Sequence, residues 1–214
     1  MFDKLFARSS ARSLPAVSSR RWVVLDTETS GLSLWRDRVI SIAAVALNVE
    51  PDLSVARIEL GDSFEAVIRQ DKPKSAKQNI LIHHIGVDAQ SHGDDEPTVL
   101  KAFAQWAGDA PLFAYHAPFD KAMLSSAYKK SSLAPLPNPW TDVQPLANWA
   151  LRQTHMLGLD ECMELFGLSC IARHQAAADT FLTAELLLKL LPLIRQTATS
   201  YEALQRLAQQ NVLR

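Results

Sequence analysis

Apolar residues follow two different rhythms along this chain, one typical of strands in the first third and one typical of helices after it. The β-branched runs predict strands at 21–26, 38–47 and 64–69, the last of which begins after Gly61. A fourth apolar run predicts a strand at 111–116. Apolar residues at helical spacing predict helices at 96–109, 118–130, 143–153, 159–168, 176–194 and 200–210.

The order of these elements predicts the fold class. Strands come first and helices then alternate with a further strand, which is typical of an α/β fold in which a mixed sheet is flanked by helices in a single domain. Gly108 is a helix stop signal and Ser200 a helix cap. The segment 135–142, PLPNPWTD, is rich in proline and predicts a surface connection.

Composition excludes some classes of protein. The chain has 214 residues, of which 48% are hydrophobic, and a net charge of −1, so no global field attracts it to nucleic acid or to an anionic membrane. The longest apolar run, VISIAAVAL, is far shorter than the roughly 20 residues that cross a bilayer, so we expect no membrane span. Cys162 and Cys170 form neither a CxxC motif nor a disulfide scaffold. A reducing, cytoplasmic location fits best.

The first residues differ in composition from the rest. Arg and Ser dominate residues 1–21, a composition shared by mitochondrial transit peptides and disordered leaders. We favour a leader, because Asp3 lies at its start and nothing else in the sequence indicates an organelle. The predicted division is therefore a flexible leader at 1–20 and one domain at 21–214.

Two carboxylates at the end of the first predicted strand require an explanation. Residues i and i+2 of a strand face the same side, so Asp26 and Glu28 project together while Thr27 points away. Like charges on one face repel each other, and a divalent cation between them would relieve the repulsion. Capping of the turn at 29–31 is an alternative that this fragment alone leaves open.

Two further acids stand near helix starts, each preceded by a histidine. Asp120 lies in the first turn of a predicted helix after His116, where the helix dipole alone favours an acid. Asp179 interrupts a helix rich in Ala and Leu, on or beside its core-facing stripe, and His174 precedes it in a predicted loop. A buried acid at position 179 needs a partner.

Taken in order, these fragments resemble the DEDDh 3′–5′ exonucleases, the group that includes the proofreading epsilon subunit of bacterial DNA polymerase III. The resemblance covers about residues 21–192. Lesser similarities are His83 in a His-x-Ile segment and the segment TDVQPLA. The chain departs from the family pattern at His84, where Gly is usual, and at His116, where Asn is usual. The residues that match the three main motifs are Asp26, Glu28, Thr29, Gly31, Leu32, Phe119, Asp120, His174 and Asp179.

The resemblance implies a ribonuclease H-like fold and hydrolysis from a 3′ end with two ions, Mg²⁺ or Mn²⁺. It implies that Asp26 bridges both ions, that Glu28 and Asp179 hold the ion on the nucleophile side, and that Asp120 acts largely through water. His174 then fits as general base, with a loop histidine of no function as the alternative. The expected substrate-side residues are Thr29, Leu32, His83, His116 and Phe119. Leu32 would wedge against the terminal base, and Phe119 would pack under the site and not stack on a nucleotide.

The expected partner is the 3′ end of a single-stranded nucleic acid. We favour DNA over RNA, because the pattern looks closer to the epsilon subunit, although the residues do not display the pocket that would read a 2′-hydroxyl. An enzyme that trims RNA or degrades oligoribonucleotides is the first alternative. A catalytically silent polymerase-binding module is the second, and association with a DNA polymerase as a subunit stays open.

Overall fold

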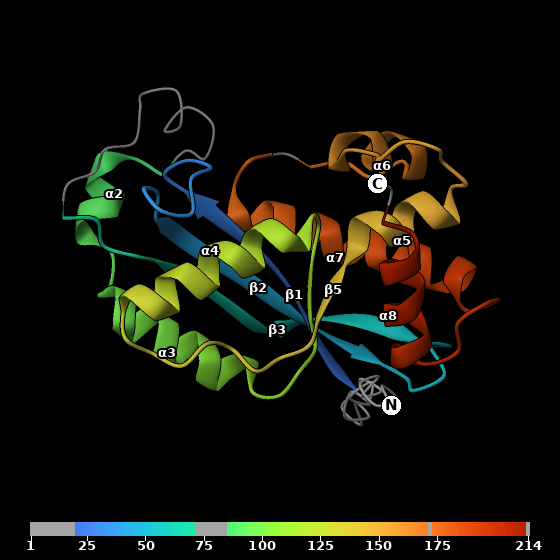
Figure 1. The fold of residues 1–214 in the computed structure, drawn as a ribbon. Coiled ribbons are helices and arrows are strands. Elements are labelled where there is room, and N and C mark those ends of the chain that lie inside the picture. Colours follow the sequence, from blue (N-terminus) through green and yellow to red (C-terminus); the bar gives the residue numbers. More distant parts are fainter. Residues whose placement is uncertain (1–19, 72–84, 171–172, 213–214) are drawn as a thin grey trace, which may run out of the picture.

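The long strands near the start of the chain form the antiparallel half of one mixed sheet in the computed structural model (Figure 1). The model describes residues 20–71, 85–170 and 173–212. Two short strands extend the sheet beyond β1, running parallel to it. The sheet order is β3-β2-β1-β4-β5, formed by β1 (Arg21–Thr29), β2 (Val39–Val49), β3 (Ala56–Val67), β4 (Leu112–Ala114) and β5 (Trp140–Asp142).

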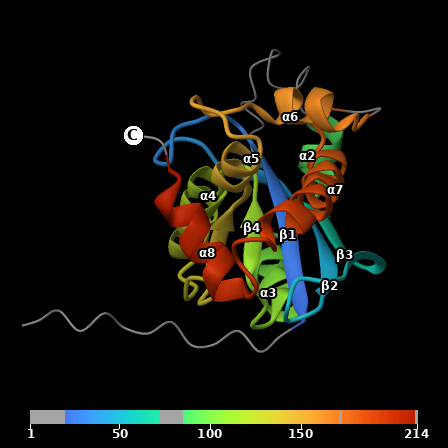
Figure 2. The same cartoon turned by 90° about the vertical axis from the view of Figure 1, so that its right-hand side faces the viewer.

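Helices cover both faces of this sheet, which confirms the predicted α/β class and the single domain. Figure 2 shows α7 on one side of β1 and β2, with α3 and α4 on the other. In the described part of the chain no helix has both the length and the apolar character to span a membrane. The helices are α2 (Val87–His92), α3 (Glu96–Ala107), α4 (Ala117–Lys130), α5 (Val143–Ala150), α6 (Leu159–Phe166), α7 (Ala176–Ile194) and α8 (Tyr201–Gln210).

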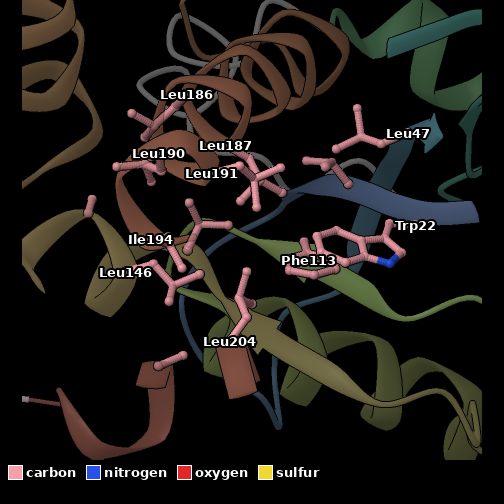
Figure 3. Packing of buried hydrophobic residues seen from close by; sticks show 14 of the residues in the cluster. Trp22, Leu47, Phe113, Leu146, Leu186, Leu187, Leu190, Leu191, Ile194 and Leu204 are labelled. Atoms are coloured by element: carbon pink, nitrogen blue, oxygen red, sulfur yellow. The ribbon is translucent and has the colours of Figure 1, made fainter. Parts of the chain in front are cut away.

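Alternation along β1 divides the core into two clusters. Trp22 and Val24 pack with the leucines of α7, and Trp22 stacks on Phe113 with ring centroids 4.8 Å apart (Figure 3). Val23 and Leu25 face the opposite side, with residues of α3 and α4. Because side chains alternate between the faces, the next even positions of β1 continue on the α7 side.

Two strand predictions were wrong in extent. The third strand begins at Ala56 rather than 64 and includes Gly61, because a shift in register after Val45 accommodates extra residues of β3. The segment 135–142 is not only a surface connection, since its end forms β5 against β4. Asn138 in the same segment is buried, and its amide donates to two backbone carbonyls.

Three other predictions also need comment. The fourth strand ends at Ala114, so His116 does not end a strand but lies in the left-handed region at φ 62°, and helix α2 was not predicted. Arg20, the last residue of the predicted leader, already accepts a backbone hydrogen bond from Val49. Residues 1–19 of that leader, and both His83 and His84, lie outside the described residues.

Candidate active site

The C-terminal half of β1 carries the first two acids of the site. Asp26 and Glu28 follow Trp22 and Val24 on the same face, so they point to the α7 side of the sheet, half-buried. The pairing of β1 with β2 shifts between Glu28 and Thr29, where the strand ends. The predicted projection of both carboxylates from one face therefore agrees with the register of the sheet.

Asp120 approaches β1 from the opposite face. It lies in the first turn of α4 and is 4% exposed. Thr27 points to that face, as predicted, and binds Asp120 twice: its Oγ1 donates to Oδ1 over 2.7 Å and its backbone N over 3.1 Å. The strand residue between Asp26 and Glu28 thus fixes the third carboxylate beside them.

Asp179 has the partner that its buried position requires. It lies in the first turn of α7 and is 8% exposed. Arg173 Nη1 donates to its Oδ1, and the backbone N of His174 donates to its Oδ2 over 3.2 Å. The guanidinium also donates through Nε to Asp160 of α6 over 2.7 Å. The sequence required a partner for Asp179, but only the structure identifies it as Arg173.

Electrostatics show that these carboxylates share one environment. Burial raises the pKa of Asp26 well above its usual range, and the charges of Asp120, Glu28 and Asp179 raise it further. Burial, followed by the charges of Asp179 and Asp120, raises the pKa of Glu28 to about 7. Arg173 opposes both increases. The charged forms of these carboxyls are therefore disfavoured by one another, and a cation close to them would stabilise the charged forms.

The donor chemistry of this cluster fits hard divalent cations. Mg²⁺ and Mn²⁺ take oxygen ligands, and a cation would relieve the repulsion that the neighbouring acids exert on Asp26 and Glu28. Within the described ranges no three acids, cysteines or histidines are already grouped as metal ligands. Thr27 engages one oxygen of Asp120 and Arg173 one of Asp179, so each of these carboxylates keeps a second oxygen that these side chains do not contact.

The two histidines of the predicted site both have left-handed backbones, at φ 62° for His116 and 63° for His174, and both are exposed. The backbone N of His116 donates to Asp142 Oδ1 over 2.9 Å, at the end of β5. That of His174 binds Asp179. Thus both histidines lie next to segments that carry a carboxylate of the cluster.

The remaining described substrate-side residues lie around the same edge. Thr29 Oγ1 donates to the carbonyl of Gly31 over 2.9 Å, which orders the turn after β1. Leu32, in the loop that follows, is 83% exposed. Phe119 is half-buried and packs against the α3 and α4 cluster. Among these residues, Leu32 presents an apolar side chain to solvent, whereas Phe119 packs its ring from α4 against the buried cluster.

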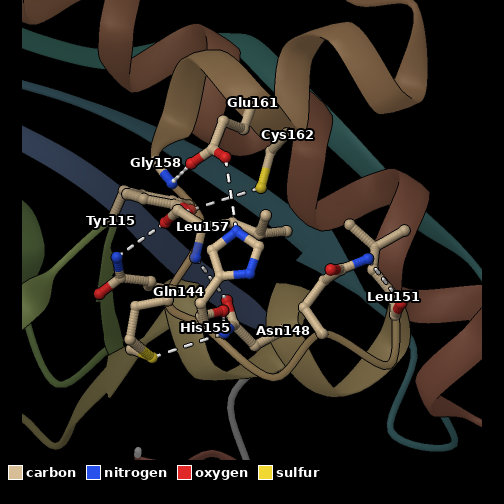
Figure 4. A network of polar contacts seen from close by, with 11 residues as sticks. Tyr115, Gln144, Asn148, Leu151, His155, Leu157, Gly158, Glu161 and Cys162 are labelled. Atoms are coloured by element: carbon tan, nitrogen blue, oxygen red, sulfur yellow. Dashed lines mark hydrogen bonds and ion pairs between the residues drawn. The ribbon is translucent and has the colours of Figure 1, made fainter.

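A polar network supports α6 next to the cluster (Figure 4). Tyr115 Oη and Gln144 Nε2 both donate to the carbonyl of Leu157, over 2.7 and 2.8 Å. The backbone N of Leu157 donates to Asn148 Oδ1 over 3.1 Å. These bonds fix the loop before α6, and α6 carries the Asp160 that binds Arg173.

Comparison with known proteins assigns the family. A family model described as Exonuclease matches residues 23–187, a span that contains all four carboxylates and His174. The chain belongs to this Exonuclease family. Within the family it is a DEDDh-type 3′–5′ exonuclease, as the three motifs predict. Exonucleases of this family generally depend on divalent metal ions.

Three similar proteins place the chain more closely. It is 34% identical over 173 residues to the PolC-type DNA polymerase III of Bacillus subtilis (strain 168), covering 79% of this chain and 11% of that protein. Exonuclease X in complex with 5′-overhanging duplex DNA superposes with a TM-score of 0.64 at 20% identity, covering 87% of this chain and 99% of that one. The nuclease domain of 3′hExo, a DEDDh family member bound to rAMP, gives 0.67 at 17% identity, covering 83% and 94%.

The share of each protein that is covered limits what these relatives imply. This chain spans only 11% or 12% of the length of the curated polymerases that it matches. Exonuclease X and the 3′hExo nuclease domain, by contrast, are covered almost completely, and they share the fold of this chain. The ribonuclease H-like fold predicted from the motifs is confirmed.

Proposed function

We propose that this protein removes nucleotides from the 3′ end of single-stranded DNA with two ions of Mg²⁺ or Mn²⁺, releasing nucleoside 5′-monophosphates. The observation that carries the proposal is the convergence of acids from β1, α4 and α7 into one cluster in which burial and mutual repulsion raise the pKa of Asp26. An acidic cluster of this kind is suited to two hard cations.

Asp26, Glu28, Asp120 and Asp179 would hold the ions. Asp26 is best placed to serve both, because the charges of the three other acids all act on it. Asp120 keeps one oxygen on Thr27, which favours a contribution through water. When bound, the ions supply the Lewis acidity that activates the attacking water and stabilises the departing 3′ oxygen.

His174 would take the proton from the attacking water. The residue is exposed, while its backbone N is tied to Asp179, so His174 is held beside a proposed ligand and its side chain can reach solvent. Imidazole exchanges protons near neutral pH, which suits a general base. The chain supplies no other histidine bonded to a carboxylate of this cluster among the described residues.

The substrate side would use the loop after β1 and the start of α4. Leu32 is exposed enough to wedge against the terminal base, and Thr29 orders the turn that carries it. His116 would contact the strand from the position just before α4. Phe119 would support this surface by packing, and a contact of His83 with substrate remains a prediction.

DNA is favoured as substrate because relatives that match in sequence are DNA polymerases of the PolC type. Association with a polymerase as a subunit is part of the proposal on the same ground. RNA is the second candidate, because 3′hExo, with the same fold, was solved with rAMP. A cytoplasmic location agrees with two free cysteines, Cys162 and Cys170, and stays a prediction.

The test uses matched DNA and RNA strands, each blocked at one end, with and without chelator. Mononucleotides should be released from free 3′ ends, faster from DNA, and no product should appear in excess chelator. Asp26→Asn serves as the control for contaminating nuclease and should be inactive while still folded. Shortening from a free 5′ end, or full activity in chelator, would exclude the proposal, and a strong preference for RNA would select the second candidate.

A further inference from the structure

The loop between β1 and β2, residues 30–38, carries next to Leu32 a second exposed apolar side chain, Trp35, that the proposed function does not use. Leu32 is 83% exposed and Trp35 is 89% exposed. All five tryptophans of the chain lie in the described part, and Trp35 is the exposed one, whereas the others are buried or half-buried. Large aromatic side chains normally contribute to a core, so one that stands free on a loop indicates a contact surface.

This loop is well braced, so the exposure of Trp35 does not reflect a loose segment. The Asp37 carboxylate accepts from Ser30 Oγ over 3.1 Å and from Ser33 N over 2.8 Å. Gly31 packs so closely on Asp37 that an added Cβ would lie 2.6 Å from Oδ2, so a larger residue here would push this carboxylate away from Ser30 and Ser33. The carboxylate of Asp37 therefore organises the loop from within.

The loop is also fixed to the helix that carries Asp120. Ser126 Oγ of α4 donates to the carbonyl of Leu34 over 3.0 Å, and Lys130 Nζ donates to the same oxygen over 3.3 Å. At its other end the loop begins directly after the strand of Asp26 and Glu28, beyond the arrowhead of β1 (Figure 1). Trp35 is thus held in a fixed place relative to two of the segments that form the acidic cluster.

Two arginines, Arg36 and Arg38, follow Trp35 in the loop. Arg36, Arg38 and Arg69 line a pocket of about 540 Å³ with the acids Asp71, Asp95 and Glu96. The ion pairs in it are long: 4.0 Å between Arg38 and Glu96, and 3.8 Å between Arg69 and Asp95. Within the described chain Arg36 has no ion pair and is exposed. A phosphate that approached this pocket would therefore meet a guanidinium that is not already neutralised by contact.

We propose that Trp35 is a stacking platform for a base upstream of the 3′-terminal nucleotide, with Arg36 contacting the phosphate backbone of the same strand; this inference rests on the proposed function. Aromatic stacking accepts any base, because every base has a π-face, and arginine beside it follows the backbone. A net charge of −1 gives the protein no general attraction to nucleic acid, so a local platform is what retains the strand.

A nucleic acid fits this surface better than a protein does. The exposed apolar side chains Leu32 and Trp35 are followed in the loop by the cations Arg36 and Arg38, and the loop continues from the strand that carries Asp26 and Glu28. The loop begins directly after the strand of Asp26 and Glu28 and is bonded to α4, so a strand whose 3′ end lies at these acids would find stacking and phosphate contacts together if it left along this loop.

The experiment separates long from minimal substrates. The variants Trp35→Ala and Trp35→Phe are assayed on a short single-stranded DNA and on thymidine 5′-(p-nitrophenyl phosphate), which has no upstream nucleotide. Trp35→Ala should lower kcat/KM on the strand about 5- to 100-fold, the range that loss of one stacked base produces. It should leave hydrolysis of the nucleotide ester unchanged, and Trp35→Phe should restore most of the loss.

Two controls make the result specific. Leu60→Ala removes another exposed apolar side chain, 68% exposed on β3, and should change neither rate. Binding of the strand to an Asp26→Asn background should quench tryptophan fluorescence, and Trp35→Phe should abolish the quenching, because Trp35 is the exposed indole. This binding signal does not depend on turnover.

The outcomes distinguish this inference from the proposed function. Unchanged rates on the strand in Trp35→Ala, without quenching in the parent, would overturn the inference and leave the loop as a protein-docking surface. Equal losses on strand and ester would also overturn it, because Trp35 would then serve the terminal nucleotide. If the wild type degrades no strand at all, the proposed function fails, and the quenching of Trp35 by DNA still decides whether the loop binds a strand.

Discussion

Two histidine-to-helix junctions, one before α4 and one before α7, look alike in backbone but differ in what they bind. His116 and His174 both have left-handed backbones and are both exposed. Each is followed by a helix with a buried aspartate in its first turn, Asp120 or Asp179. The local chain geometry therefore does not distinguish a base from a substrate contact.

The difference lies in where the polar groups of each junction point. At α7 the aspartate turns back to its own junction and binds Arg173 and the backbone N of His174. At α4 the aspartate turns away to Thr27, and the backbone N of His116 binds Asp142 on β5 instead. The comparison teaches that the backbone of His174 is tied to the acidic cluster through Asp179, whereas the backbone of His116 is tied to Asp142 on β5.

The largest expected effect tests this assignment with one matched substitution. Asn tolerates the left-handed backbone, so His174→Asn and His116→Asn preserve the junctions and change only the rings. His174→Asn should lower kcat by about 10²- to 10⁴-fold, the contribution of a general base, with metal affinity near that of wild type. His116→Asn should raise KM by less than about tenfold, the loss of one substrate hydrogen bond.

Steady-state kinetics on single-stranded DNA and calorimetry with Mn²⁺ provide both measurements. Equal losses of kcat in the two variants would remove the distinction between the junctions. A loss of metal affinity in His174→Asn would instead make His174 a ligand or a structural residue.

The sequence predicted the parts of this site that depend on local pattern. Alternation along β1 placed Asp26 and Glu28 on one face and Thr27 on the other, and helical spacing placed Asp179 near the core. These predictions succeeded because a period of two or 3.6 residues fixes direction without knowledge of the rest of the fold. The placement of Asp120 against Thr27, however, depends on the packing of α4 under the sheet.

What the sequence could not give depends on contacts between distant or irregular segments. β5 has three residues in a proline-rich stretch and is a strand only because it pairs with β4. Arg173 became the partner of Asp179 through the geometry of the loop before α7. The sequence did not distinguish Trp35 from the other tryptophans, because no local pattern separates an exposed tryptophan from a buried one.

The next prediction compares how the buried carboxyls of the two junctions, Asp120 and Asp179, affect the stability of the metal-free protein. Burial raises the pKa of Asp120 from 3.8 to about 7, against the hydrogen bonds from Thr27. Its carboxyl therefore contributes stability that is complete below about pH 4 and is lost as the pH rises through about 7. Asp120→Asn keeps the neutral form at every pH, so it should stabilise the protein at about pH 8 by on the order of 2–4 kcal/mol, with little change at about pH 4.

Asp179→Asn is the matched comparison and should have the opposite sign at about pH 8. It removes a carboxylate that is already compensated by Arg173, so it should destabilise the protein by on the order of 1–3 kcal/mol. Denaturant unfolding of both variants at the two pH values, in chelator, provides the measurement. Destabilisation by both variants at pH 8 would show that the carboxylates of Asp120 and Asp179 are both compensated in the folded protein, so that the junctions do not differ in charge.

The smallest effect concerns Arg173, which occupies the place of a cation at the α7 junction. A metal ion that binds Oδ1 of Asp179 has to displace the guanidinium, and Asp160 is the other carboxylate that Arg173 contacts in the described part of the chain. Arg173→Gln removes the competitor, so Mn²⁺ should bind about tenfold more tightly, whereas Asp160→Asn removes the group that receives the displaced guanidinium and should weaken binding a few-fold. The double variant should behave like Arg173→Gln, because Asp160 acts only through the arginine. Arg195→Gln, the same substitution in a pair with Asp52 at the far end of α7, is the control and should leave the affinity unchanged. Calorimetric titration of the chelator-treated proteins measures all four variants without substrate, and weaker Mn²⁺ binding in Arg173→Gln would mean that the arginine supports the site by holding the loop instead of competing with the ion.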